Sequence, residues 1–416
     1  MTEYYSAKTD FYGNSSPEIL IKEFGSPLYV YNEKILRQKC KDMKNLVDYP
    51  HFIPNYSIKA NSNLQVLKIV KEEGLMADAM SAGEIQLLLH AGFKPENLFF
   101  VPNNVSEAEL RYAVDNKVLV SVDSLSQLEL LGKINPGGKA AVRFNPGVGA
   151  GHHEKVITAG KKTKFGVNID SAPQVKEIAK KYNLKICGIN QHIGSLFMEG
   201  DSYIEGVKSI LSVAEQFEDI DFVDMGGGFG IPYKKQAGQL PLDLASFKVK
   251  LTQVLEQWTN KYGKKILFKS EPGRYIAAEC GILLGTVYAT KSNYGNKYVG
   301  TDIGFNVLAR PVMYDSYHEL EAYRDGKPLN EEATEEVTVV GNICESGDII
   351  AKKRTLPVIK EGDILGIMDA GAYGFAMSSN YNMRLKPAEV MIKENGEAML
   401  IRRRDTFEDL IANFNV

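Results

Sequence analysis

The chain has 416 residues, of which 44% are hydrophobic and 24% charged, a composition typical of globular proteins rather than of disordered or fibrous ones. Its 49 Lys and Arg residues against 52 Asp and Glu residues give a formal net charge of −3. This balance lacks the basic excess that binding to a phosphate backbone requires, so nucleic acid is not an expected partner. The length exceeds that of one typical domain and predicts two or three.

The N-terminal residues, the lack of a long apolar stretch and the cysteines indicate the cellular compartment of the protein. Residues 1–13 have neither the basic start nor the apolar core of a secretory signal, and no later stretch has the roughly 18 uninterrupted apolar residues that a membrane span needs. The four cysteines, Cys40, Cys187, Cys280 and Cys344, are widely scattered and form no CxxC pair. These features predict a cytoplasmic protein with no membrane partner.

The first long region of the chain alternates short β-rich runs with helical patterns, which indicates βα units and a parallel sheet. The runs lie at residues 52–59, 75–79, 97–101, 118–122, 140–144, 186–191, 221–225 and 266–270. Eight such units over about 220 to 250 residues match the size of a (β/α)8 barrel. An open doubly wound sheet is the main alternative. It usually carries a GxGxxG turn after its first strand, where this chain has Ala60-Asn61-Ser62.

Three Ser-x-x-Glu or Ser-x-x-Gln sequences predict helix starts within this region. They are Ser81–Glu84, Ser106–Glu109 and Ser124–Gln127. Each fits a capping box, in which two side chains satisfy the free N–H groups of the first turn.

After about residue 283 the pattern changes to strand-like runs with few helical stretches between them. These runs lie at residues 283–290, 336–340, 363–367, 388–392 and 398–402. They predict a separate β domain, a β-sandwich or β-barrel, which an early strand at residues 27–31 could join. We therefore expect a barrel over residues 36–282 and a β domain made of residues 1–35 and 283–416.

Polar residues follow the predicted strands where a barrel enzyme places its site, at the C-terminal strand ends. Lys59 ends the first run, and His192-Ile-Gly-Ser195, Gly226–Gly230 and Glu271-Pro-Gly-Arg274 follow the last three. Glycines let backbone N–H groups approach a phosphate, and an Arg adds a bidentate partner. This set suggests pyridoxal 5′-phosphate (PLP), with Lys59 bound to it, Glu271 on its ring nitrogen and His192 stacked on its ring. Singly, each residue has a plainer explanation as a solvated lysine, a turn, a core histidine or a loop.

Segments around these residues resemble the alanine-racemase-like, fold-type III PLP-dependent decarboxylases. They are residues 56–61, 78–84, 192–195, 224–232 and 271–274. Later segments narrow the resemblance to the diaminopimelate decarboxylase family. They are residues 310–318, 344–348, 372–375, 379–382 and 402–405. The resemblance covers nearly the whole chain.

The resemblance implies a role for individual residues. Lys59 carries the PLP and Cys344 is the proton donor, which a decarboxylase needs because loss of CO₂ leaves a carbanion at Cα. The cofactor-binding residues would be Lys59, Asp78, His192, Ser195, Gly226, Gly227, Gly228, Gly230, Glu271, Gly273, Arg274 and Tyr373. The substrate-binding residues would be Arg274, Arg310, Tyr314, Glu345 and Tyr373. The resemblance also implies a homodimer with active sites at its interface.

The implied reaction is decarboxylation of meso-2,6-diaminopimelate to L-lysine and CO₂, the last step of lysine biosynthesis. The distal end of this substrate carries both an ammonium and a carboxylate, for which Glu345 and Arg310 are suitable partners. A decarboxylase of ornithine, lysine or a related amino acid is the nearest alternative. A non-catalytic regulatory homologue and an amino-acid racemase are less favoured, since the former would not need Lys59 and the latter would not carry Glu271.

Two further signals are discounted. Pro146–His153 is rich in glycine and ends in two adjacent histidines, but it opens no helix with a P-loop lysine, and adjacent histidines do not easily chelate one ion. We predict a loop that covers the site, and no metal. The run Arg402–Arg404 is typical of a solvated surface.

Overall fold

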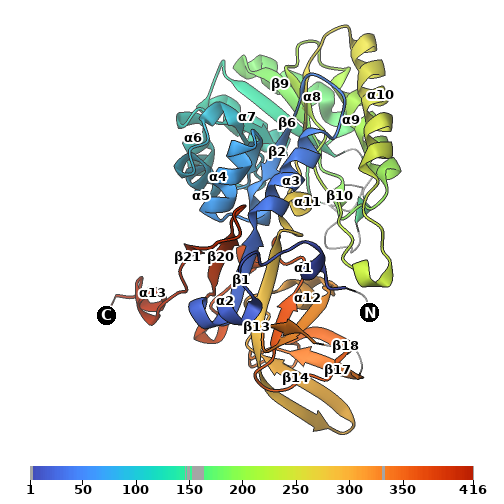
Figure 1. The fold of residues 1–416 in the computed structure, drawn as a ribbon. Coiled ribbons are helices and arrows are strands. Elements are labelled where there is room, and N and C mark those ends of the chain that lie inside the picture. The colour runs from blue at the N-terminus through green and yellow to red at the C-terminus, as the bar shows by residue number, and fades with distance from the viewer. Residues whose placement is uncertain (1–2, 146, 148–149, 152–163, 330–332, 416) are drawn as a thin grey trace. The chain divides into compact units, whose positions relative to one another are not determined.

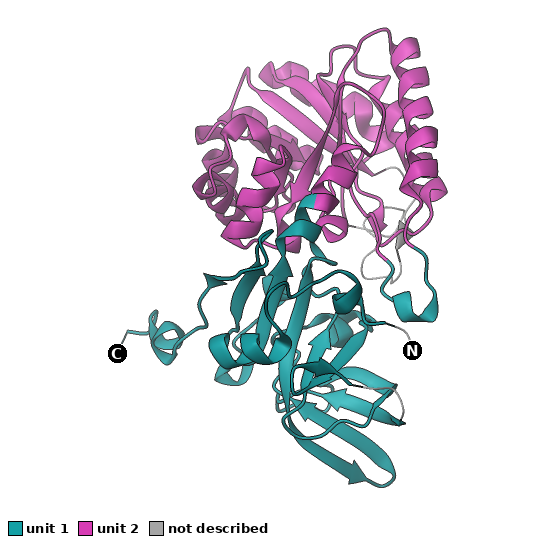
Figure 2. Ribbon diagram, in the orientation of Figure 1, with its two compact units in different colours: residues 1–37, 232–240, 277–416 teal, residues 38–231, 241–276 magenta. Residues whose placement is uncertain are grey.

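The computed structural model describes residues 3–145, 147, 150–151, 164–329 and 333–415. It divides into two compact units, coloured in Figure 2: unit 1 comprises residues 1–37, 232–240 and 277–416, and unit 2 comprises residues 38–231 and 241–276. Most of the predicted covering loop, Pro146–His153, lies outside the described residues.

Unit 2 contains a barrel of parallel strands (Figure 1). In the described part of the chain they are β2 (Phe52–Ser57), β3 (Met76–Ala79), β4 (Leu98–Phe100), β5 (Leu119–Val122), β6 (Lys139–Asn145), β9 (Lys185–Asn190), β11 (Phe222–Asp224) and β12 (Leu267–Ser270). Each pairs with the next in this order, and β12 pairs with β2, which closes the ring. The predicted (β/α)8 barrel is confirmed, and the open doubly wound sheet is excluded. The described residues of unit 2 also form three short strands. Strand β8 (Val167–Asn168) lies beside β6, and β7 (Ala150–Gly151) pairs with β10 (Gly194–Ser195).

A helix follows each barrel strand. These are α4 (Leu64–Glu72), α5 (Ala82–His90), α6 (Glu107–Asp115), α7 (Leu125–Ile134), α8 (Ala172–Tyr182), α9 (Gly200–Ala214), α10 (Leu244–Tyr262) and α11 (Arg274–Ala277). Helix α9 illustrates why they form: Val207, Ile210, Leu211 and Ala214 recur at helical spacing and are all buried. The first boundary between the units along the chain falls within α3 (Glu33–Lys44).

The predicted helix starts are correct, although only one is a complete capping box. The hydroxyls of Ser81, Ser106 and Ser124 each accept a hydrogen bond from the backbone N–H three residues on. The return contact is made only at Ser106, whose N–H donates to Glu109. The Glu84 carboxylate instead accepts from the N–H of Met80, one residue before the cap.

The barrel interior combines an apolar layer with buried charge. Phe99, Val101, Ala141, Cys187 and Phe222 form an apolar cluster. Burying aliphatic and aromatic side chains of this kind contributes about 1.5–3 kcal/mol each. Polar and charged side chains are buried alongside them: Asn55, Asp78, Arg143, Asn190, Asp224, Lys269 and Glu271. A barrel built only for stability has no need of these charges.

Unit 1 is built on a mixed sheet. Within the described ranges its strands are β1 (Leu28–Asn32), β13 (Gly281–Asn293), β14 (Asn296–Thr301), β15 (Leu320–Arg324), β16 (Lys327–Pro328), β17 (Thr334–Val340), β18 (Ile349–Pro357), β19 (Ile364–Ile367), β20 (Ala388–Ile392) and β21 (Ala398–Arg402). Strand β1 pairs antiparallel with β13 and parallel with β20, so the N-terminal strand joins the β domain as predicted.

The strand β13 holds this sheet together. Its first half pairs with β1 and β19, and its second half pairs with β14. Leu28, Val30, Ile282, Leu284 and Val390 from β1, β13 and β20 are buried in one apolar core. Among the described residues, four α-helices lie wholly within unit 1: α1 (Tyr5–Lys8), α2 (Pro17–Phe24), α12 (Arg310–Tyr314) and α13 (Phe407–Ile411). No helix in the part of the chain that the structure describes is long and apolar enough to cross a membrane.

Candidate active site

Lys59 lies just past the C-terminal end of β2, on the short 3₁₀ turn η1 (Ile58–Ala60). The predicted strand ran to Lys59, but the strand ends at Ser57, whose N–H donates to the Pro272 carbonyl (3.2 Å). The turn is fixed on its far side by Tyr56, whose hydroxyl donates to the Asn61 carbonyl at 3.0 Å. The Lys59 side chain is therefore presented at the strand-end rim of the barrel, where the sequence placed it.

Two buried carboxyl groups and one half-buried carboxyl group share the electrostatic influence of Lys59. Burial raises the pKa of Asp78, Glu84 and Glu271, and the charge of Lys59 opposes that rise in each case. Glu271 is only 4% exposed, and its Oε1 has no hydrogen-bond partner among the described residues. A buried carboxylate oxygen without a partner is costly, which marks Glu271 as a residue kept for function.

His192 is neutral and its orientation is fixed. Burial and the nearby charges of Lys59 and Arg143 hold the pKa of His192 well below its usual value. Its Nδ1 accepts a hydrogen bond from the Gly227 N–H (3.2 Å), so the proton of the neutral ring is on Nε2. The 3.7 Å approach of Nδ1 to the Glu271 carboxylate is therefore not an ion pair.

The glycine segment Gly226–Gly230 packs against the ends of neighbouring strands. A Cβ added at Gly227 would lie 1.9 Å from the Glu271 carbonyl oxygen, and one at Gly226 would lie 2.3 Å from the Gln191 carbonyl oxygen. Gly226 and Gly228 also have φ of +77° and +110°, which disfavour other residues. The segment accordingly needs glycine for its packing.

Ser195 and Arg274 are brought together at this rim. The Arg274 guanidinium donates to the Ser195 hydroxyl at 3.0 Å. Arg274 begins α11, directly after the Glu271-Pro-Gly turn, where Gly273 is packed against Ser57 and Ala60. The sequence separated these residues by 79 positions, and the barrel places them in contact.

The barrel holds three charged residues whose roles the sequence analysis did not assign. Arg143 on β6 is buried, and Glu271, Asp123 and Asp78 oppose the lowering of its pKa by burial. Lys269 on β12 lies over the Phe222 ring at 4.7 Å, and burial lowers its pKa too. The signal was available, because a charged residue inside a run of buried-strand residues must face either the barrel interior or a paired site.

Asp224 is the third of these residues, and it supports the glycine segment. Its carboxylate accepts from the Gly226 N–H at 2.9 Å and from Asn55 Nδ2 at 3.1 Å. Burial raises its pKa, and Lys269 opposes that rise. Asp224 thereby fixes the backbone at the start of the segment.

Other candidate residues belong to unit 1. Arg310 begins α12 and is 2% exposed. Its Nη1 donates to His318 Nε2 at 2.8 Å, and since arginine cannot accept, His318 carries its proton on Nδ1, which donates to the Met368 carbonyl (2.7 Å). The Tyr233 ring lies against both side chains, 4.8 Å from the guanidinium carbon and 5.3 Å from the imidazole.

Cys344 and Glu345 lie on the exposed loop between β17 and β18. Cys344 is exposed, whereas Cys40, Cys187 and Cys280 are buried, and all four are free thiols. The Cys344 N–H donates to Asn382 Oδ1 (2.8 Å), and the Glu345 carboxylate accepts from the Tyr381 hydroxyl (2.5 Å).

Tyr314 and Tyr373 are both half-buried in unit 1. Tyr314 ends α12. Tyr373 has φ of +56° and precedes Gly374, where an added Cβ would lie 2.7 Å from the Tyr29 hydroxyl.

Comparison with known proteins identifies the family. Residues 33–278 match the model of the pyridoxal-dependent decarboxylase, pyridoxal binding domain. The diaminopimelate decarboxylase of Methanothermobacter thermautotrophicus is 41% identical over 97% of this chain and 95% of its own length. The chain belongs to the diaminopimelate decarboxylase family. The diaminopimelate decarboxylase of Escherichia coli K12 is 35% identical to this chain over 94% of both chains. The solved diaminopimelate decarboxylase from Helicobacter pylori, complexed with L-lysine, has a TM-score of 0.87 and 30% identity over 95% of this chain and 98% of its own.

Family membership makes the chain a PLP-dependent amino-acid decarboxylase. The residues at the barrel rim fit that cofactor. The buried Oε1 of Glu271 without a partner suits a protonated ring nitrogen, and the glycine segment with Arg274 and Ser195 suits a phosphate. A lysine at the same rim suits the cofactor's aldehyde.

Proposed function

We propose that the chain decarboxylates meso-2,6-diaminopimelate to L-lysine and CO₂, the last step of lysine biosynthesis. Support comes from relatives named diaminopimelate decarboxylase that align over nearly the full chain. The structural observation that carries the proposal is the buried Glu271 carboxylate with a partnerless Oε1, beside Lys59 and neutral His192. This arrangement suits a cofactor whose ring must stay protonated while CO₂ leaves.

The barrel residues would hold the cofactor, which supplies an electron sink for the bond to the departing CO₂. Lys59 would bind it covalently, and Glu271 would keep its ring nitrogen protonated. His192, being neutral, would stack on the ring without adding charge to that face. Their supporting set is Asp78, Ser195, Gly226, Gly227, Gly228, Gly230, Gly273 and Arg274, with Tyr373 from the β domain.

The β-domain residues would act on the substrate. Cys344 donates the proton from its Sγ to the substrate Cα once CO₂ has left. Glu345 binds the distal ammonium, while Arg310 and Tyr314, together with Arg274 and Tyr373, bind the distal carboxylate. Arg310 suits this role because its guanidinium is buried and already oriented by His318, so a carboxylate meets a fixed, weakly hydrated cation.

The resemblance to the family extends the proposal to the assembly. The enzyme is a homodimer in which residues 36–282 of each chain form the PLP-binding barrel and residues 1–35 and 283–416 form the β domain, with the active sites at the dimer interface. We place it in the cytoplasm, since the four cysteines are free thiols that suit a reducing compartment.

The experiment that tests the proposal measures CO₂ release by the purified protein with PLP. The substrates are meso-diaminopimelate, L-lysine, L-ornithine and D-lysine. Release from meso-diaminopimelate, with at least about a hundredfold lower kcat/KM for the others, is expected because they leave Arg310 without a carboxylate. Release mainly from ornithine or lysine would replace the substrate but keep the decarboxylase. Lys59→Ala serves as the control and should abolish turnover. Retained PLP-dependent turnover in that variant would contradict the role of Lys59.

A further inference from the structure

The segment Asn380–Arg384 holds the Cys344–Glu345 loop at three points. The Tyr381 hydroxyl donates to the Glu345 carboxylate (2.5 Å), Asn382 Oδ1 accepts from the Cys344 N–H (2.8 Å), and Arg384 Nη2 donates to the Asn342 carbonyl (3.0 Å). We call residues 380–384 the clasp. Three residues of the clasp thus contact three residues of one loop.

The clasp has a rigid base of its own. Asn380 Nδ2 donates to the Arg384 carbonyl at 2.9 Å, which closes the clasp on itself, and to Asp405 Oδ2 at 3.2 Å. Asp405 is in turn paired with Arg402 at 2.5 Å. Part of the basic run that was predicted to be a solvated surface therefore anchors the clasp.

The backbone of the clasp aims the Asn382 side chain. Asn382 and Met383 both have φ of +55°, in the left-handed region that asparagine tolerates better than most residues. The Tyr381 ring packs on Phe305, with ring centroids 5.7 Å apart. This conformation fixes the direction from which Oδ1 meets the Cys344 N–H.

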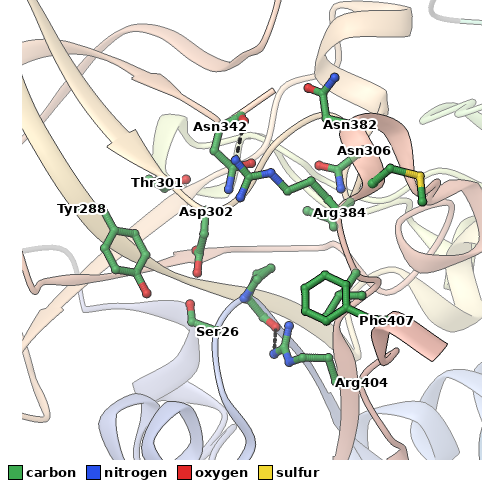
Figure 3. A pocket seen from close by; sticks show the side chains of 14 residues that line it. Ser26, Tyr288, Thr301, Asp302, Asn306, Asn342, Asn382, Arg384, Arg404 and Phe407 are labelled. Carbon is green, nitrogen blue, oxygen red and sulfur yellow. Dashed lines mark hydrogen bonds between the residues drawn. The ribbon is translucent and has the colours of Figure 1, made fainter. Parts of the chain in front are cut away.

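Asp348 also holds the loop. Its buried carboxylate accepts from the Ile343 N–H at 2.8 Å and from the Phe305 N–H at 2.7 Å. Asn342 and the clasp residues Asn382 and Arg384 border a cavity of about 760 Å³ within unit 1 (Figure 3). On the side of this cavity, the hydrogen bonds from the clasp restrain the loop.

We propose that Asn382 is a positioning residue for the proton donor: through the Cys344 N–H it sets where the Sγ proton is delivered. The inference rests on the proposed role of Cys344. After CO₂ leaves, the remaining electron pair is shared between the substrate Cα and the cofactor carbon bonded to the substrate nitrogen. A proton at Cα gives the amino-acid product. A proton at the cofactor carbon, followed by hydrolysis with water, gives pyridoxamine phosphate and an aldehyde.

Two matched variants separate positioning from folding. Asn382→Gly keeps the left-handed backbone and removes the acceptor, whereas Asn382→Asp keeps an acceptor oxygen. We expect Asn382→Gly to lower kcat about tenfold, to leave KM within about twofold, and to raise the share of turnovers that end in pyridoxamine phosphate at least about fivefold. Asn382→Asp should stay within about threefold of the wild type on each measure.

A second readout does not depend on turnover. The other three thiols are buried, so the rate of alkylation by iodoacetamide, followed by mass spectrometry of the holoenzyme, reports on Cys344. Asn382→Gly should change this rate at least about threefold and Asn382→Asp should not. The positioning role is wrong if the two variants have the same share of turnovers ending in pyridoxamine phosphate and the same alkylation rate. It is also wrong if Asn382→Gly keeps the wild-type product ratio.

The variant Cys344→Ala tells the two proposals apart. It should lower kcat and raise the pyridoxamine phosphate share at least as much as Asn382→Gly. If Cys344→Ala keeps the wild-type kcat and products, the donor assignment itself fails. If it behaves as expected while Asn382→Gly does not, only the role of Asn382 is overturned.

Discussion

Glu271 and Asp78 are carboxylic acids that the barrel buries with few compensating contacts. Burial raises the pKa of each, and for Asp78 the neighbouring Glu271 raises it further. Such residues lower the stability of the fold at neutral pH, because their charged forms are poorly solvated. A protein keeps them where function needs a charge or a proton at a defined point.

Glu271→Gln should therefore weaken catalysis and strengthen the fold. We expect kcat to fall about a hundredfold, since an amide does not hold the ring nitrogen protonated. The sign of the stability change follows from the raised pKa. Below about pH 4 both folded and unfolded states bind the proton, and the variant gains nothing. As pH rises, only the unfolded wild type ionises, so the wild type loses stability by about 1.4 kcal/mol per unit up to the folded pKa.

The measurement is urea unfolding of the cofactor-free variant and wild type at pH 5 and pH 8. The advantage of the variant should be larger at pH 8. A wild type that is more stable than Glu271→Gln at pH 8 would show that the carboxylate is a structural partner, and would remove the basis for its proposed role.

Several individual residues of the barrel rim could be predicted from the sequence alone. Lys59, His192, Glu271 and Arg274 follow strand ends, and that position alone places them at one rim. Arg143 was not recognised in the same way, because it sits within a strand run and the direction in which a strand residue points depends on barrel closure. The clasp contacts of Asn382 join positions 38 residues apart and have no sequence pattern.

Among the elements, α12 shows how a short helix can carry a specificity group. It is five residues long, too short to be stable alone, and its first residue is the buried Arg310. The guanidinium is held by His318, which is held in turn by the Met368 carbonyl. The helix is positioned by this polar relay and by the Tyr233 ring rather than by its own hydrogen bonds.

His318→Leu should raise the KM for meso-diaminopimelate about tenfold while kcat changes less than about threefold, because Arg310 loses the acceptor that orients it but the cofactor site is untouched. His318→Gln is the matched control, since its Oε1 can replace Nε2 as the acceptor, and it should recover most of the affinity. Steady-state kinetics and cofactor absorbance would check both. An equal loss in the two variants, or a fall in kcat without a rise in KM, would rule out the positioning role.

The elements that the sequence failed to predict share one property. Strands β14 and β18 carry polar residues over much of their length, and β15 places Glu321 among buried neighbours. These segments are strands because they pair with β13, β17 and β19, which satisfy their backbone hydrogen bonds. They lack the hydrophobic run by which a strand is usually recognised in a sequence. The barrel strands were predictable because both faces of a parallel sheet are buried and read as apolar runs.

In the whole molecule, the residues proposed to bind the cofactor and those proposed to act on the substrate lie mainly in different units. Lys59 and the cofactor-binding rim belong to unit 2, and Cys344, Glu345 and Arg310 belong to unit 1. Periodicity and motifs describe each unit from its own residues, but they carry no information on which chain a neighbouring unit belongs to. The homodimer is therefore a prediction that needs its own experiment.

Mixing two inactive variants provides it. Lys59→Ala lacks the cofactor lysine and Cys344→Ala lacks the proton donor, so each homodimer has two defective sites. If each site combines the barrel of one chain with the Cys344 loop of the other, a mixed dimer contains one intact site. Unfolding and refolding an equal mixture should then restore about 25% of wild-type activity, since half of the dimers are mixed and each has one working site of two. Activity should be absent when the variants are refolded separately and then combined briefly. Refolded mixtures that contain mixed dimers by mass spectrometry but show no recovered CO₂ release would mean that each site is built within one chain.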